Sequence, residues 1–287
     1  MKTLRECIAE AVQTKTAIGH FNISNLEGFW ATVYAGKSLG VPVIIGVSEG
    51  ERDFVGVAQV SALVKSTQAE GFQVYLNADH SYSVERVKIA IDAGFDAVIF
   101  DGAECSFDDN LKQAKECVAY ARSSGRDVIV EGELGFIGKS SKILEGIPPG
   151  VKISEEFLTK PEDATRFVKE TGVDLLAPAV GNIHGMLKDG IDPALNIERV
   201  KVIADASRAP LVLHGGSGNS ADDVAKAISA GVSIVHINTE LRVAYRKGLV
   251  QALAEFPDEI APYKYLKPAR EAMRKVVEEK LRIFNRK

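Results

Sequence analysis

The sequence has little of what marks secreted, membrane-bound and nucleic-acid-binding proteins. Its 287 residues include only three cysteines, Cys7, Cys105 and Cys117, and this odd number at irregular spacing does not make a disulfide framework. No apolar run approaches the roughly 20 residues of a membrane span, and residues 1–6 lack the apolar core of a signal peptide. The net charge of −4 gives no reason to expect nucleic acid or an anionic membrane as a partner. We therefore expect a cytoplasmic protein with reduced cysteines.

A short pattern recurs along the chain, in which a glycine separates a helical segment from a run of β-branched and apolar residues. The glycine suits the left-handed residue that closes a helix, and the apolar run suits a parallel strand that is buried on both faces. Two further apolar runs, residues 16–22 and 210–213, lack the glycine. The six runs that have it begin at Gly40, Gly71, Gly94, Gly125, Gly172 and Gly231.

Eight strands that alternate with helices predict an α/β fold, a (β/α)8 TIM barrel formed as a single domain by residues 1–287. An open, doubly wound sheet is the alternative, but no GxGxxG motif follows the first strand. Apolar periodicity predicts helices over residues 83–93 and 220–230, and Ser220 is a suitable N-cap for the second.

Two segments depart from the alternation of strands and helices. Residues 139–154 are polar, carry Pro148, Pro149 and Gly150, and are too long for a routine connection between a strand and a helix. We interpret this segment as a mobile lid. Residues 268–284 are rich in Lys, Arg and Glu, and they predict a C-terminal amphipathic helix with a solvated charged face.

Most of the histidines fall at predicted strand ends, where a barrel places its chemistry. His80, His184 and His214 follow the third, sixth and seventh strands. Three histidines with an open coordination position are typical of catalytic zinc. His236 ends the eighth strand, whereas His20 lies within the first, where we expect a structural role.

Acidic residues accompany these histidines. Asp79, Asp101 and Glu133 are placed to orient the imidazoles or to transfer protons. Asp79 could instead cap a helix, because a helical pattern begins just after it. No lysine occupies a predicted strand end, although Schiff-base chemistry on a ketone needs a desolvated lysine. This absence favours a metal over an iminium as the electron sink.

The segment after the seventh strand has the outline of a phosphate cradle. Residues 215–218 read Gly-Gly-Ser-Gly and precede a predicted helix, and glycines let backbone N–H groups approach an anion. Asn238 and Thr239 end the eighth strand, and barrels often bind phosphate between the loops after strands seven and eight. A phosphorylated substrate needs such a local site because the chain as a whole is negatively charged.

Several short motifs occur in order along the chain: Phe21-Asn22 and residues 42–51, 79–80, 131–135, 176–179, 184–185, 213–218, 238–240 and 265–272. Together they resemble the class II fructose- and tagatose-bisphosphate aldolases, nearly end to end. The resemblance implies a catalytic zinc ion on His80, His184 and His214, with Asp79 as the acid/base for the hydroxyl proton at the cleaved bond. It also implies an alternative or second metal position at Asp101 and Glu133, and a monovalent cation near the substrate phosphate.

The implied chemistry is consistent with a metal site. Breaking a carbon–carbon bond next to a ketone leaves an enediolate, whose charge a Lewis acid such as zinc stabilises. The resemblance implies that the dihydroxyacetone phosphate portion is held by Gly185, Gly215, Gly216, Ser217, Asn238 and Thr239. We expect further substrate contacts from Asn22, Ser48, Lys188 and His236.

Three features depart from the family pattern. Asn77 stands where many members have histidine, and His236 stands where they commonly have asparagine. The lid begins with Gly138 and Lys139, whereas the family's lid often opens with a glycine pair and adjacent acids, one of which abstracts the substrate proton. Glu145 is the first carboxylate after Gly138, so it is either the replacement base or a solvated side chain without a role.

We therefore expect a metal-dependent aldolase that reversibly cleaves a ketose 1,6-bisphosphate, with fructose as the leading candidate, to dihydroxyacetone phosphate and glyceraldehyde 3-phosphate. Two alternatives stay open: the same chemistry on tagatose bisphosphate or another phosphorylated ketose, and a barrel that has lost activity and acts by binding. Lys139 and Lys142 could attract the second phosphate of the substrate as point charges. We expect a homodimer or homotetramer.

Overall fold

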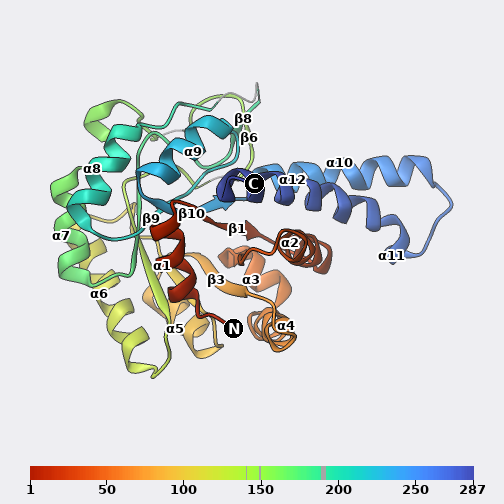
Figure 1. Cartoon of the computed structure of the whole chain (residues 1–287), viewed down its shortest axis with the longest axis horizontal. Coiled ribbons are helices and arrows are strands. Elements are labelled where there is room, and N and C mark those ends of the chain that lie inside the picture. Colours follow the sequence, from red (N-terminus) through yellow and green to blue (C-terminus); the bar gives the residue numbers. More distant parts are fainter. Residues whose placement is uncertain (140, 149, 189–191) are drawn as a thin grey trace.

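The computed structural model describes residues 1–139, 141–148, 150–188 and 192–287, and its centre is a closed barrel of parallel strands (Figure 1). Around the barrel the order is β1-β2-β3-β4-β5-β7-β9-β10, and β10 pairs with β1 to close it. The strands are β1 Ile18–Asn22, β2 Val43–Val47, β3 Val74–Ser81, β4 Ala97–Phe100, β5 Ile129–Leu134, β7 Leu175–Pro178, β9 Leu211–Leu213 and β10 Val232–Ile237. The predicted TIM barrel is confirmed, and each strand overlaps an apolar run of the sequence.

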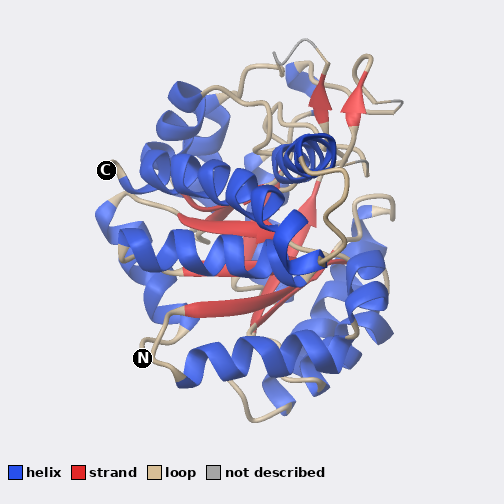
Figure 2. Cartoon of the chain, turned by 90° about the vertical axis from the view of Figure 1, so that its right-hand side faces the viewer, coloured by secondary structure: helices blue, strands red, loops and turns tan. Residues whose placement is uncertain are grey.

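Helices surround the strands on the outside of the barrel (Figure 2). The predicted N-cap is present, because the Oγ atom of Ser220 accepts a hydrogen bond from the third residue of α9, and Ser83 caps α5 in the same way. Gly40 and Gly172 close their helices with positive φ, as predicted. The helices are α1 Leu4–Thr14, α2 Leu26–Leu39, α3 Glu49–Val55, α4 Val57–Ala69, α5 Val84–Asp92, α6 Phe107–Ser123, α7 Pro161–Thr171, α8 Ile197–Ser207, α9 Ala221–Ala230, α10 Thr239–Glu255, α11 Pro262–Tyr265 and α12 Lys267–Asn285.

The barrel interior is apolar at one end and polar at the other. At the N-terminal end of the strands, inward side chains such as Ile18, Ile129 and Ile234 pack against α1 in one buried cluster. Side chains alternate along a strand, so β5 turns Val130 outward to the helices and Glu131 and Glu133 to the same side as Ile129. Helix α1 thus closes one end of the barrel, and the polar residues gather at the other end.

The predicted lid contains short regular structure. Strand β6, Ile143–Leu144, pairs in parallel with β8, Met186–Leu187, and this pair lies beyond the C-terminal ends of the barrel strands, at the top of Figure 2. Two residues of the predicted lid, Ser140 and Pro149, lie outside the described residues.

The C-terminal region forms a helical arm. Helices α10, α11 and α12 make a hairpin that projects from the barrel, at the right of Figure 1, and α12 returns to pack against α2. The predicted helix over residues 268–284 is confirmed as α12. In the part of the chain that is described, no helix is both long and apolar enough to cross a bilayer.

Candidate active site

Three histidines meet at the polar end of the barrel, as the sequence predicts. His80 lies near the end of β3, His214 directly follows β9, and His184 lies in the segment after β7. The ring centroid of His80 lies 4.7 Å from the ring centroid of His184 and 4.7 Å from that of His214. One nitrogen of each ring lies within 4.8 Å of the others, so the three could hold a metal ion.

The second nitrogen of each ring is fixed by a partner that faces away from this point. His80 Nδ1 lies 2.9 Å from Asp101 Oδ2, His184 Nδ1 2.5 Å from the Gly138 carbonyl oxygen, and His214 Nε2 2.7 Å from Glu131 Oε1. The nitrogens that remain include His80 Nε2 and His214 Nδ1, which are 3.1 Å apart. Metal-binding histidines almost always have such an outer partner, so this donor set fits a metal.

The charge distribution of the cluster also suits a cation. Burial by itself would lower the pKa of His80, but the carboxylates of Asp79, Asp101 and Glu133 raise it to about 10. Burial, together with the neighbouring His80, lowers the pKa of His184 to about 4. Without a metal, His80 is therefore the histidine of these three that carries a positive charge, and a divalent cation can replace that charge. His80 also has a positive φ of 39°, an uncommon backbone conformation that is often found at functional sites.

Asp79 is buried at the centre of the site. Its Oδ2 accepts a hydrogen bond of 2.7 Å from Asn22 Nδ2, and its Oδ1 lies 3.4 Å from His236 Nδ1 and 3.7 Å from His80 Nε2. Burial would raise the pKa of Asp79, but His80, His236 and His20 hold it well below the usual range. The alternative that Asp79 caps a helix is wrong, because Asp79 belongs to β3 and Ser83 caps α5.

Two glutamates of β5 lie behind the histidines. Glu133 Oε2 is 3.4 Å from His80 Nδ1, and Glu133 forms with His80 and Asp101 a second group that could hold a metal. Burial raises the pKa of both Glu131 and Glu133 well above the usual range. Glu131 carried no predicted role, although the alternation of side chains along β5 places it on the same face as Glu133.

The remaining histidines form a stack beneath the site. The His20 and His236 rings are parallel, with centroids 3.5 Å apart and an interplanar angle of 3°, and His236 also stacks on His214 at 4.1 Å. Parallel rings cannot both point a nitrogen lone pair at one ion, so this pair does not suit joint metal ligation. His20 is fully buried, in keeping with the structural role predicted for it.

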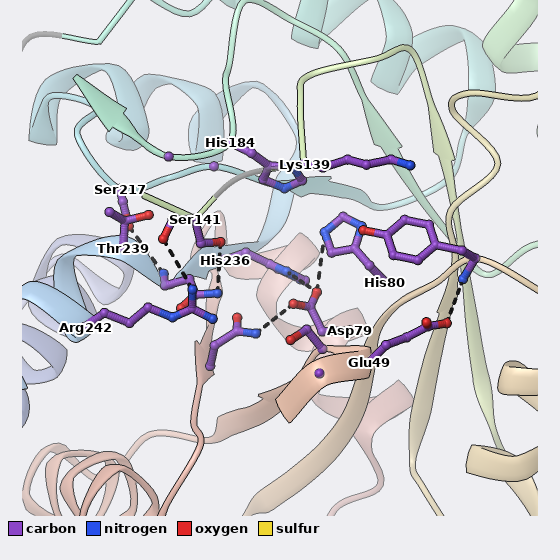
Figure 3. Close-up of a pocket in the computed structure, with 17 residues that line it drawn as sticks. Glu49, Asp79, His80, Lys139, Ser141, His184, Ser217, His236, Thr239 and Arg242 are labelled. Atoms are coloured by element: carbon purple, nitrogen blue, oxygen red, sulfur yellow. Dashed lines mark hydrogen bonds and ion pairs between the residues drawn. The ribbon is translucent and has the colours of Figure 1, made fainter. Parts of the chain in front are cut away.

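A pocket opens above the histidines and Asp79 (Figure 3). Its glycine-rich side is tightly built: Gly215 has a φ of 64°, and a Cβ there would collide with the carbonyl oxygen of Ile183. Ser217 Oγ accepts 3.3 Å hydrogen bonds from the backbone N–H groups of Asn238 and Glu240, which joins the loops after β9 and β10. The predicted residues that line the pocket are Asn22, Ser48, Asp79, His80, Lys139, His184, Gly185, Gly215, Ser217, His236, Asn238 and Thr239.

Some predicted residues are not at the pocket wall. His214, Asp101 and Glu133 lie behind it, and Gly216 does not line it. The structure also places Glu145 and Lys188 elsewhere: they form an ion pair of 2.9 Å at the β6–β8 pair, and both side chains are largely exposed. Other lining residues carried no prediction from the sequence as substrate contacts: Glu49, Gly50, Tyr82, Ser141 and Arg242.

Known proteins share both the sequence pattern and the fold. A family model described as class II fructose-bisphosphate aldolase matches residues 2–287. Fructose-bisphosphate aldolases of Geobacillus stearothermophilus and Staphylococcus epidermidis are 36% and 35% identical, each over 98% of this chain and 96% of the relative.

Among solved structures, the YdjI aldolase of Escherichia coli K12 is 30% identical with a TM-score of 0.81, over 98% of this chain and 96% of that one. Fructose-bisphosphate aldolase of Campylobacter jejuni, at 22% identity over 98% of this chain and 94% of that one, shares the fold with a TM-score of 0.82. With the family model matched along almost the whole chain and these relatives aligned end to end, the chain belongs to the class II fructose-bisphosphate aldolase family.

Proposed function

We propose that this chain reversibly cleaves fructose 1,6-bisphosphate to dihydroxyacetone phosphate and glyceraldehyde 3-phosphate. The observation that carries the proposal is the convergence of one nitrogen each from His80, His184 and His214 beside the buried carboxylate of Asp79. The substrate that the family's name specifies fits a pocket with this cluster at its base and a glycine-rich cradle at its side.

The proposed metal is zinc, held by His80, His184 and His214. When bound, zinc supplies a Lewis acid for the negative charge that develops as the bond next to the ketone breaks. Asp101, the Gly138 carbonyl and Glu131 hold the three rings in the orientation that ligation needs. The group of His80, Asp101 and Glu133 is the proposed second metal position, and a monovalent cation beside the phosphate completes the proposed cofactors.

Asp79 is the proposed acid/base. Its ionised carboxylate takes the proton of the substrate hydroxyl at the cleaved bond, and it returns that proton in the condensation direction. The hydrogen bond from Asn22 fixes the orientation of the carboxylate. Since the carboxylate is buried and lines the pocket, it can reach substrate without a shell of bulk water.

The phosphate of dihydroxyacetone phosphate is proposed to lie against the glycine-rich loops. Gly185, Gly215 and Ser217 line this side, Asn238 and Thr239 lie beside Ser217, and Gly216 belongs to the same loop but does not line the pocket. Helix α10 begins at Thr239, so its N-terminal N–H groups and dipole add to the attraction of an anion.

A cleavage assay tests the proposal and its alternatives. Release of dihydroxyacetone phosphate is measured with fructose 1,6-bisphosphate and with tagatose 1,6-bisphosphate, before chelation, after chelation and after zinc is restored. Faster zinc-dependent cleavage of the fructose sugar supports the proposal, whereas faster cleavage of the tagatose sugar supports the second candidate, which His236 at the pocket floor favours. No cleavage of either sugar by the zinc-loaded protein would leave a binding role.

We further propose that the chain forms a cytoplasmic homo-oligomer, a dimer or tetramer, through the α10–α12 arm. The end of this arm carries exposed apolar side chains: Phe256, Ile260 and Tyr263 are 52%, 89% and 76% exposed. Exposed apolar side chains gathered at the end of a projecting element are typical of a surface that another chain covers.

A further inference from the structure

The buried face of helix α12 carries one charged side chain, and no step of the proposed reaction uses it. The buried residues of this helix are Ala269, Met273, Val277, Lys280, Leu281 and Phe284, among which only Lys280 is ionisable. The Lys280 side chain is 11% exposed. Burial of an ammonium among apolar side chains is unfavourable unless the charge is paired. The partner of Lys280 therefore decides what this buried charge does.

That partner is Glu240, in the first turn of α10. Lys280 Nζ lies 2.8 Å from Glu240 Oε1, and the Glu240 side chain is 21% exposed. Helices α10 and α12 pack against each other, as Figure 1 shows. Because both side chains are largely buried, salt and water screen this pair less than an ion pair at the surface.

The same carboxylate oxygen holds the loop of the phosphate cradle. Glu240 Oε1 accepts a 2.9 Å hydrogen bond from the backbone N–H of Gly218, and the backbone N–H of Glu240 donates to Ser217 Oγ at 3.3 Å. Gly218 has a φ of 86°, and a Cβ there would collide with the carboxylate of Asp192. The cradle loop, residues 215–218, is therefore closely packed against the segment after β8 and bonded to the first turn of α10.

Glu240 also brings a negative charge close to the cradle. It directly follows Thr239, where α10 begins, so it stands at the helix end that is proposed to attract the substrate phosphate. An unpaired carboxylate at this end would oppose the helix dipole and repel the anion. The ammonium of Lys280 lies on the oxygen that accepts from Gly218, and it compensates this charge. Glu240 can thus hold the loop without weakening the attraction of the phosphate.

We propose that Lys280 and Glu240 are positioning residues for the substrate phosphate. Their ion pair holds the cradle loop in place and keeps its support electrically neutral, although neither side chain lines the pocket. This inference rests on the proposed aldolase function and adds to it a contribution from the C-terminal helix. It follows that the charge of Lys280 matters for phosphate binding only while Glu240 is charged.

The test is a cycle of three variants: Lys280→Met, Glu240→Gln and the double variant that combines them. Glu240→Gln keeps an oxygen that can accept from the Gly218 N–H, and it removes the negative charge. Inorganic phosphate is the probe, and its dissociation constant is measured by calorimetry on the zinc-loaded protein. The kinetic readouts are kcat and the KM values for dihydroxyacetone phosphate and for glyceraldehyde 3-phosphate in the condensation direction.

For Lys280→Met, we expect the dissociation constant of phosphate and the KM for dihydroxyacetone phosphate to rise about 3- to 30-fold, as for an unfavourable charge at a partly buried helix end. Both constants should return close to the wild-type values in the double variant. The KM for glyceraldehyde 3-phosphate and kcat should stay nearly unchanged, because the cradle is proposed to hold only the dihydroxyacetone phosphate portion.

Lys275→Met is the matched control, since it removes an exposed lysine from the same helix and should change neither constant. Lys280→Arg keeps the charge and should retain phosphate affinity. Thermal unfolding verifies that each variant folds, and Lys280→Gln replaces Lys280→Met in the cycle if the methionine variant does not fold.

A double variant that binds phosphate as weakly as Lys280→Met would show that Lys280 does not compensate the charge of Glu240, and would overturn the inference. Lower thermal stability with unchanged phosphate affinity, or equal rises in KM for both substrates, would mean that the pair only joins α12 to α10, and would overturn it too. Calorimetry needs no turnover. A wild type that binds phosphate but cleaves no sugar would therefore count against the aldolase function alone.

Discussion

Asp79 combines burial, negative charge and access to the pocket, and few side chains in a barrel interior do so. Since Asp79 caps no helix, its role is open to a direct test by an isosteric change that removes the acid. Its neighbours Asn22 and His236 would still contact the amide, so the shape of the site would be kept.

For Asp79→Asn we expect kcat for cleavage to fall by about 10²–10⁴, the usual contribution of a general acid or base. Asp96→Asn is the control: this carboxylate is partly buried, but it accepts hydrogen bonds from the Leu76 backbone N–H and Gln68 near the N-terminal ends of the strands. The control should lose stability and keep its turnover. Wild-type turnover in Asp79→Asn would remove Asp79 from the mechanism.

The metal cluster gives a second prediction at the scale of residues. Each of the single variants His80→Ala, His184→Ala and His214→Ala should bind less zinc than the wild type. Metal analysis after equilibration with buffered zinc measures this content. Zinc affinity should rise with pH through the neutral range, because the pKa of His80 is raised to about 10 and its proton competes with the metal. Full zinc content in a variant that lacks two of these histidines, or affinity that rises on acidification, would contradict the assignment.

At the scale of elements, the β6–β8 pair links the predicted lid to the segment that carries His184. The pairing of Ile143 with Met186 holds residues 143–144 beside the chain that follows Gly185. Glu145, the candidate base, lies at the far side of this pair with Lys188 rather than in the pocket. To act as the base it would have to be carried over the pocket by a movement of the whole pair.

We therefore expect Glu145→Gln to exchange the methylene proton of dihydroxyacetone phosphate with solvent at nearly the wild-type rate. This exchange needs the base but not the aldehyde, so it isolates the step in question, and NMR in D2O measures it. Lys188→Met, which frees Glu145 from its ion pair, serves as the companion variant. A loss of more than about tenfold in Glu145→Gln, within the range of a lost general base, would restore Glu145 as the base and show that the lid moves.

At the scale of the whole molecule, the barrel buries its apolar side chains, whereas the end of the α10–α12 arm leaves apolar side chains exposed. Helices α10 and α12 pack on each other and leave Phe256, Ile260 and Tyr263 exposed at the end of the hairpin. We expect the double variant Ile260→Asp, Tyr263→Ser to sediment as a smaller species than the wild type at equal concentration. Val202→Asp, at an exposed apolar position of α8, should not change the sedimentation coefficient. A wild type that is monomeric would contradict the proposal directly.

The sequence by itself determined the barrel and most of the proposed site. Eight apolar runs with closing glycines are local signals, and a parallel barrel places all strand ends on one rim whatever its details. The sequence therefore predicts that His80, His184, His214 and Asp79 lie close together at this rim.

Only the tertiary structure decided which side chains partner them. Glu131 behind His214, the stack of His20 on His236, and the contact of Arg242 with Glu51 join residues far apart in the sequence. The position of Glu145 in the predicted lid likewise depended on the tertiary structure. The sequence placed Glu145 near the site, but the pairing of β6 with β8 set the direction of its side chain. Periodicity specifies which face of an element is buried, whereas the distances between faces depend on how the closed barrel positions its loops.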